Sequence, residues 1–193
     1  MKLGIMGGTF DPIHLAHLVI AQVVLEELGL DKVLFIPAAR PPHKERPRVT
    51  AEDRLKMTRL AVAGHDKFEC SDIELRREGP SFTVMTLDQL REQFGPSAEF
   101  FLIVGADSLV EMDTWREPER IARMARLVVV PRPGFTLSAA DLSRYGEVIR
   151  VEMPEIGLAS AWIRKELRRG RDLRYVIPEP ARRYIIDREL YRD

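Results

Sequence analysis

Two histidines close behind a pair of glycines are the side chains of this sequence best placed to do chemistry. His14 and His17 are three residues apart and follow Gly7 and Gly8 in the stretch Gly-Gly-Thr-Phe-Asp-Pro-Ile-His-Leu-Ala-His. On the first turn of a helix, this spacing puts both imidazoles on one face. Glycine lets the backbone approach a ligand closely, and a helix start offers unpaired N–H groups and a positive dipole end. The stretch therefore predicts an anion-binding site.

Three other kinds of site would also place glycines or histidines in such a stretch. The glycine spacing is not that of a dinucleotide-binding fingerprint, and no Gly-Lys-Ser/Thr follows to make a Walker loop. A zinc site needs further ligands, and Cys70, His43 and His65 form no obvious set with the two histidines. From these residues alone, a strand-to-helix turn with two incidental surface histidines stays an open alternative.

The elements that would position this turn alternate between strands and helices. An apolar run at residues 3–6 predicts a strand before the turn, and residues 18–28 predict a largely buried helix after it. We expect further strands at 32–37, 68–75, 99–104, 127–130 and 148–151, and helices at 50–63, 83–94, 119–125, 137–145, 160–167 and 178–186. This alternation predicts an α/β, three-layer, Rossmann-like fold with a mostly parallel sheet, helices on both faces and ligands at the carboxyl ends of the strands. We expect a single domain over residues 1–193, with a small helical part from about residue 155 onward.

The composition limits the classes of protein that the chain can belong to. Its 193 residues are 45% hydrophobic, which is ample for one large core. The 30 basic and 30 acidic residues leave no net charge, which argues against nonspecific nucleic-acid binding as the main task. A single cysteine excludes an internal disulfide and fits a reducing compartment. No hydrophobic segment is long enough for export or for spanning a membrane, so we expect a cytoplasmic protein without a membrane partner.

Several polar residues farther along the chain have a structural explanation beside a functional one. The basic, proline-rich segment at 38–49 follows a strand end, where open α/β sheets keep their ligands, but it could also be a solvated linker. Thr83 suits a helix N-cap. Asp107 suits either an N-cap or a hydrogen bond to a ribose or base. Trp115 could be core, although its polar neighbours suggest an accessible ring. Ser160 opens a basic helix that could simply be solvated.

Several strings, in the same order along most of the chain, resemble the bacterial nicotinate mononucleotide adenylyltransferases of the nucleotidylyltransferase superfamily. The first is the Gly-Gly-Thr-Phe-Asp-Pro-x-His stretch. The others are Pro-Pro-His-Lys at 41–44, Gly-Pro-Ser-Phe-Thr at 79–83, Gly-Ala-Asp at 105–107, the tryptophan at 115, Arg-Pro-Gly at 132–134 and Ser-Ala-Trp-Ile-Arg at 160–164. The sequence departs from the family pattern at Ala16, Phe82, Arg116, Ala159 and Ala161, where the family usually has Gly, Tyr, Tyr, Ser and Thr.

This resemblance implies transfer of AMP from ATP to nicotinate mononucleotide, giving deamido-NAD and pyrophosphate. The mononucleotide phosphate is already an anionic nucleophile. No general base or covalent intermediate is then expected, and the protein supplies in-line positioning and charge neutralisation. Mg²⁺ would be coordinated mainly by the ATP phosphates and water, because the sequence shows no cluster of carboxylates that could bind it.

The same resemblance implies a role for each site residue. The phosphate-binding catalytic residues are His14, His17, Lys44 and Arg164. The residues against ATP are Gly7, Gly8, Thr9, Phe10, Gly105, Asp107, Arg132, Ser160 and Ile163. The residues around nicotinate mononucleotide are Thr83, Trp115 and Arg116.

Two alternatives to this activity stay open. The acceptor could be nicotinamide mononucleotide, phosphopantetheine or another phosphorylated molecule, although Thr83, Trp115 and the segment around Phe82 favour a pyridine ring. The chain could also be a non-catalytic nucleotide sensor, since Ala159 and Ala161 lack the hydroxyls usual in the family. The sequence does not indicate an oligomeric state.

Overall fold

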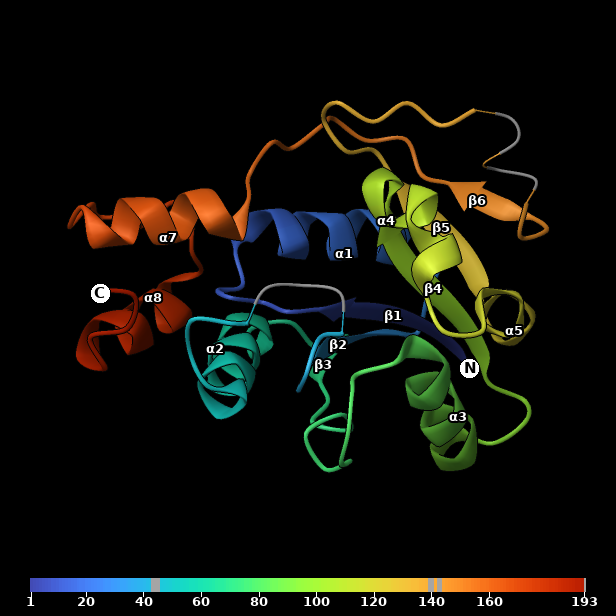
Figure 1. Ribbon diagram of the computed structural model, residues 1–193. Coiled ribbons are helices and arrows are strands. Elements are labelled where there is room, and N and C mark those ends of the chain that lie inside the picture. The colour runs from blue at the N-terminus through green and yellow to red at the C-terminus, as the bar shows by residue number, and fades with distance from the viewer. Residues whose placement is uncertain (43–45, 139–140, 142–143, 193) are drawn as a thin grey trace.

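The computed structural model describes residues 1–42, 46–138, 141 and 144–192. Within these residues one sheet contains six strands, and each neighbouring pair is parallel. The strands are β1 (Lys2–Gly8), β2 (Lys32–Pro37), β3 (Phe68–Cys70), β4 (Glu99–Gly105), β5 (Arg126–Val130) and β6 (Val148–Arg150). The order across the sheet is β3-β2-β1-β4-β5-β6 (Figure 1). The predicted Rossmann-like α/β fold is confirmed.

The inner strands are apolar on both faces because helices cover both. Along β4, Phe101 and Ile103 belong to one hydrophobic cluster, while Leu102 and Val104 belong to the other. Figure 1 shows α1 and α3 on opposite sides of the sheet. The first cluster includes residues of α1 (Leu15–Glu27), α2 (Ala51–Val62), α7 (Ser160–Arg168) and α8 (Glu179–Asp187). The second includes residues of α3 (Thr83–Phe94), α4 (Ala106–Val110) and α5 (Pro118–Met124).

The order of the strands places a topological switch between β1 and β4. From β1 the chain builds outward through β2 and β3 on one side, and it then returns to start β4 on the other. The loops that leave two such strands diverge and open a crevice at the carboxyl ends. Gly7 and Gly8 end β1 and Gly105 ends β4, so the glycines predicted for the site flank this crevice.

Some element limits differ from the prediction for local reasons. Helix α1 begins at Leu15 rather than near residue 18, because His14 has extended backbone and acts as its N-cap. The strand expected over 68–75 stops at Cys70, since Asp72 forms a turn and pairs with Arg59 and Arg76. Helix α4 and the short 3-10 helix η1 (Met112–Thr114) were not predicted. The helix expected over 137–145 falls partly on residues 139–140 and 142–143, which lie outside the described residues.

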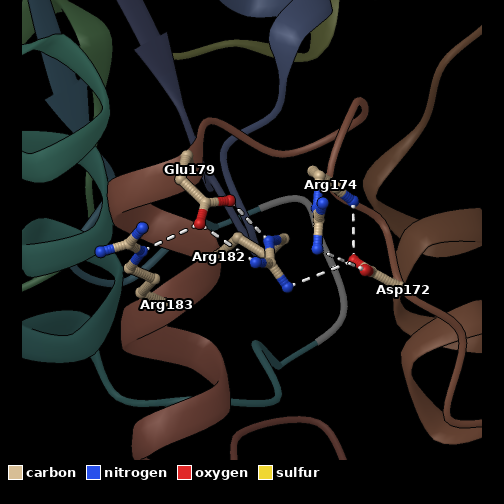
Figure 2. Close-up of polar contacts among 5 residues, drawn as sticks. All are labelled: Asp172, Arg174, Glu179, Arg182 and Arg183. Atoms are coloured by element: carbon tan, nitrogen blue, oxygen red, sulfur yellow. Dashed lines mark hydrogen bonds and ion pairs between the residues drawn. The ribbon is translucent and has the colours of Figure 1, made fainter.

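The C-terminal helices pack on the α1 and α2 side of the sheet. Ile163 of α7 and Ile185 of α8 are buried in the same hydrophobic cluster as α1 and α2. Figure 2 shows the ion pairs that hold the start of α8: Arg182 bridges Glu179 at 2.7 Å and Asp172 at 3.2 Å. Among the described residues, none of the helices has the length and apolar character needed to cross a bilayer.

Candidate functional site

A cavity of about 280 Å³ opens at the carboxyl ends of β1 and β4. Its walls come from both sides of the switch point, as the topology requires for a ligand crevice. The cavity brings together predicted residues that are far apart in the sequence. These are Gly7, Gly8, Thr9, Thr83, Gly105, Trp115 and Arg116.

The turn between β1 and α1 holds two buried polar atoms without a hydrogen-bond partner among the described residues, Thr9 Oγ1 and His14 Nδ1. Buried polar atoms are nearly always hydrogen-bonded in native proteins, so two unpaired atoms in one turn point to a ligand. His14 is 3% exposed, and its burial and the positive charge of Arg132 lower its pKa to about 4. The imidazole of His14 is therefore neutral at pH 7 and carries one N–H to donate.

His17 lies on the first turn of α1 and contacts His14 directly. The two rings stack with centroids 3.7 Å apart, and the backbone N–H of His14 donates to His17 Nδ1 at 3.2 Å. The Phe10 ring packs edge-on against His17, with centroids 5.0 Å apart. Because Nδ1 accepts a hydrogen bond, a neutral His17 carries its proton on Nε2. The prediction that the two histidines share one face agrees with this arrangement.

The start of α1 is less open to an anion than its sequence suggested. The N–H of Leu15 donates to the Val176 carbonyl at 2.9 Å, and the N–H of His17 donates to the His14 carbonyl at 3.0 Å. The N–H of His14 is taken by His17 Nδ1. The buried Oγ1 of Thr9 and Nδ1 of His14, more than these first amides of the helix, are therefore the polar atoms of the turn available to a ligand.

Asp107 and Arg132 pair beside the end of β4. The N-cap of α4 is Gly105, so Asp107 does not occupy the N-cap position considered from the sequence. Asp107 Oδ2 lies 3.6 Å from Arg132 Nε, and the charge of Arg132 acts on His14. A Cβ at Gly105 would overlap Asp107 Oδ1. The strand end thus carries a glycine so that the Asp107 carboxylate can fold back over it.

The opposite wall of the cavity is formed by the start of α3 and by the segment after η1. The N-cap of α3 is Phe82, without a side-chain cap hydrogen bond, so Thr83 begins the helix and is not its cap. The Ser81 hydroxyl instead accepts from the N–H of Arg40 at 3.0 Å, which ties the proline-rich segment to this wall. The guanidinium of Arg116 lies over the Phe82 ring, 5.1 Å from its centroid. Trp115 is half-buried and lines the cavity beside them.

Arg164 and Ser160 reach the β1–α1 turn from α7, but they contact its backbone. Arg164 Nη1 donates to the Asp11 carbonyl at 2.8 Å and lies 3.7 Å from Asp11 Oδ2. The Ser160 hydroxyl donates to the Pro12 carbonyl at 3.0 Å. The N-cap of α7 is Ala159 rather than Ser160. Both side chains therefore hold the turn in place in this structure.

Asp11 is a residue of this turn to which the sequence analysis gave no role. It is 5% exposed and accepts from the Arg48 N–H at 3.0 Å and from the Tyr191 hydroxyl at 2.8 Å. A signal was present in the sequence, because a carboxylate inside an anion-binding turn repels the anion and must serve partners within the protein. No comparable signal pointed to Tyr191.

The polar sequence around Arg54 indicates a solvated surface side chain, but the structure buries the Arg54 side chain. It is 1% exposed, and its Nη1 donates to the carbonyls of Thr9 at 2.7 Å and Ala38 at 2.6 Å. Its Nη2 donates to the carbonyl of Ala39 at 3.3 Å. Arg54 therefore joins the loops that leave β1 and β2, and two of the residues it contacts, Thr9 and Ala38, line the cavity.

Several predicted residues do not line the cavity. Among the described residues these are Phe10, His14, His17, Asp107, Arg132, Ser160, Ile163 and Arg164. Ile163 is fully buried in the core, and its N–H is bonded to the Ala159 carbonyl at 3.1 Å, so this geometry does not support a contact of Ile163 with ATP. The ring of Phe10 is also buried, and its backbone has a left-handed φ of 48°, which is uncommon for a non-glycine residue. Lys44 lies outside the described residues.

In the parts of the chain that the structure describes, no group of three or more His, Cys, Asp or Glu side chains is arranged to hold a metal ion. Cys70 is a free cysteine, and burial raises the pKa of its thiol to about 12. It is therefore a protonated thiol at pH 7 and not a metal-binding thiolate.

The chain is similar to known proteins over nearly its whole length. The model of the cytidylyltransferase-like family matches residues 5–171. A probable nicotinate-nucleotide adenylyltransferase of Thermus thermophilus is 47% identical, with 100% of both chains covered. One from Geobacillus thermodenitrificans is 42% identical, with 98% of this chain and 86% of its own length covered. The structure of Plasmodium falciparum nicotinic acid mononucleotide adenylyltransferase complexed with NaAD matches with a TM-score of 0.84 at 20% identity, covering 98% of this chain and 97% of that one. The structural match bears on the fold alone.

Proposed function

The chain belongs to the cytidylyltransferase-like family, and from this we infer that it is a nicotinate-nucleotide adenylyltransferase. It transfers AMP from ATP to nicotinate mononucleotide and releases deamido-NAD and pyrophosphate, a step of NAD biosynthesis. Relatives of that name, at 47% and 42% identity over nearly the whole chain, support this pair of substrates. The single structural observation that carries the proposal is the pair of unpaired buried atoms, Thr9 Oγ1 and His14 Nδ1, in the turn at the switch point.

The proposed reaction needs positioning and not proton removal. A phosphate oxygen of the mononucleotide attacks the α-phosphorus of ATP, and the bond to the bridging oxygen of pyrophosphate breaks in line with it. Thr9, His14 and His17 supply N–H and O–H donors at the turn where the α- and β-phosphates would lie. Because His14 is neutral, it contributes a dipole rather than a charge, and the proposed positive charges come from Lys44 and Arg164.

The cavity and the residues just past the end of β4 suit the two substrates. On the β4 side, the Asp107–Arg132 pair is available to the ribose and base of ATP. On the α3 side, the helix start at Thr83 has no side-chain cap and offers its amides to the nicotinate carboxylate. The faces of Trp115 and of the Arg116–Phe82 pair would enclose the pyridine ring.

Mg²⁺ is proposed as part of the substrate, carried on the phosphates of ATP. Mg²⁺ keeps several waters and commonly binds through substrate phosphates plus one or two carboxylates. We also propose a cytoplasmic location and a single domain. The free thiol of Cys70 supports the first, and the core that α7 and α8 share with α1 and α2 supports the second.

Pyrophosphate release by the purified protein tests this function. We expect release with Mg²⁺-ATP plus nicotinate mononucleotide, and slower release with nicotinamide mononucleotide, whose amide lacks the charge that the α3 start would bind. A Thr83→Pro substitution removes one amide at that start and should narrow the difference between the two acceptors. Tight ATP binding without release would instead identify a nucleotide sensor. Faster turnover of the amide would reject the acid as the preferred acceptor.

A further inference from the structure

We propose that Tyr191 is a positioning residue for adenylyl transfer, which acts through Asp11 to hold the turn between β1 and α1. The inference rests on the proposed function for what this turn binds. The hydroxyl of Tyr191 donates to Asp11 Oδ1 at 2.8 Å. Asp11 lies two residues after Thr9 and three before His14, the residues that hold the unpaired buried atoms. A shift of Asp11 therefore moves both Thr9 and His14.

Three segments that are remote in the sequence contact this turn at Asp11. The N–H of Arg48, from the segment after β2, donates to Oδ2 at 3.0 Å. Arg164 of α7 lies 3.7 Å from the same oxygen and donates to the Asp11 carbonyl. Tyr191 supplies the hydrogen bond to Oδ1, and no other described residue donates a hydrogen bond to that oxygen. Each donor fixes the carboxylate from a different direction, so removing one leaves a buried charge incompletely paired.

The unusual backbone conformation around Tyr191 supports a functional role for its contact with Asp11. Tyr191 has a φ of 64° and Glu189 a φ of 53°, both in the left-handed region that non-glycine residues rarely adopt. Such conformations persist where the surrounding structure determines them, and they gather near functional sites. Tyr191 is only 8% exposed, and burial beside Asp11 raises the pKa of its phenol well above its ordinary value. Its hydroxyl thus stays a donor over the working range of pH.

The segment that delivers Tyr191 is itself fixed. The start of α8 is held by the ion pairs of Glu179, Arg182 and Asp172 (Figure 2). Farther along α8, Ala181 and Ile185 are buried in the hydrophobic cluster that also contains Met57 of α2, and this packing holds the helix against α2. Tyr191 therefore reaches Asp11 from a rigid support.

Tyr191→Phe tests the role, with Tyr184→Phe as the matched control. Both changes remove one phenolic hydroxyl bonded to a carboxylate at 2.8 Å, but Asp53 is not in the β1–α1 turn. We expect Tyr191→Phe to lower kcat/KM for ATP by about ten- to hundredfold, as small misplacements of a site do. The KM for the mononucleotide should not change, because its proposed pocket is lined by α3 and the Trp115 segment. Tyr184→Phe should change kcat/KM for ATP and the KM for the mononucleotide by less than twofold, whatever its effect on the melting temperature.

A double-mutant cycle with Asp11→Asn shows whether Tyr191 acts through Asp11. If Tyr191 acts through Asp11, Tyr191→Phe adds little in the Asp11→Asn background. The proposal is overturned if the full effect of Tyr191→Phe persists there. It is also overturned if Tyr191→Phe keeps kcat/KM for ATP within twofold of the wild type, or if both tyrosine variants lose activity in proportion to their melting temperatures.

The Kd of a nonreactive ATP analogue, measured for the wild type and Tyr191→Phe, decides the question should Asp11→Asn fail to fold. An unchanged Kd together with unchanged kinetics rejects the role of Tyr191. The same measurement separates the two proposals, since the analogue binds whichever acceptor is used. A wild-type protein that binds it but releases no pyrophosphate would contradict the proposed function, and weaker binding by Tyr191→Phe would still support the positioning role.

Discussion

The stacked imidazoles of His14 and His17, with centroids 3.7 Å apart, are linked by a hydrogen bond from the His14 backbone N–H to His17 Nδ1 at 3.2 Å. This bond uses the Nδ1 lone pair of His17 and places the proton of the neutral ring on Nε2. The stacking in turn keeps the two rings parallel at the start of α1. The histidines form a pair in which one backbone sets the tautomer of the other ring, so their substitution effects should differ.

Substituting His17 tests its role as a phosphate donor. His17→Ala removes the Nε2 donor and should reduce turnover by about 10²–10³, as does loss of one preorganised oxyanion donor. His17→Gln can place an amide N–H near the Nε2 position and should recover more activity than His17→Asn, which is too short to do so. Steady-state pyrophosphate release measures all three. His65→Ala is the control, because His65 stacks on Phe68, away from the cavity. Near-normal turnover of His17→Ala would refute the role.

The lowered pKa of His14 should appear as a pH dependence of stability. Its pKa of about 4 in the folded protein lies below the ordinary 6.5, so the unfolded chain binds the extra proton first. The stability that the neutral ring preserves is thus fully present above pH 6.5 and is lost as pH falls toward 4, by up to about 3 kcal/mol. Chemical denaturation at several pH values measures this slope. His14→Gln should flatten it in that window, and an unchanged slope would show that His14 is not the group responsible.

The sequence was most informative where a residue's neighbours in the chain decide its environment. The inner strands β1, β2, β4 and β5 were predicted from their apolar runs. These strands have such runs because they are buried on both faces of the sheet. Gly7 and Gly8 were predicted in the site from the turn itself and Gly105 from the family resemblance, and the parallel sheet brings these strand ends to one edge. Thr83 and Trp115 then followed from the resemblance and line the same cavity.

Contacts between distant segments could not be read in the same way. Arg54 looks like any basic residue on an exposed helix face, and only the fold brings it under the carbonyls of Thr9 and Ala38. The resemblance implies a phosphate contact for Arg164, and it gives no sign of the contacts that Arg164 makes with Asp11. Nothing near Tyr191 in the sequence indicates its partner, which lies 180 residues earlier.

Gly7 offers a substitution that separates folding from binding. A Cβ at Gly7 would meet no atom within 4 Å, and its backbone is outside the left-handed region, yet the residue lines the cavity. Gly7→Ala should therefore keep or slightly raise stability, by up to about 1 kcal/mol, while it weakens ATP binding through the methyl group. Gly64→Ala is the control, because Gly64 is equally unhindered but does not line the cavity. Calorimetric ATP titration and thermal melting report both effects. Undiminished ATP affinity in Gly7→Ala would place the nucleotide elsewhere.

Arg54 and Arg59 lie on the same helix, but replacing each of them by methionine should have very different effects on stability. Arg54→Met keeps much of the side-chain volume but leaves the carbonyls of Thr9, Ala38 and Ala39 without their donor, so it should lower the free energy of unfolding by about 3 kcal/mol. Arg59→Met breaks an exposed pair with Asp72 and should cost less than about 1 kcal/mol. Urea denaturation of both variants measures the difference. Because Arg54 joins the loops after β1 and β2, its loss should also raise the KM for ATP, whereas Arg59→Met should not. Equal destabilisation by the two changes would mean that the buried guanidinium does not hold these loops.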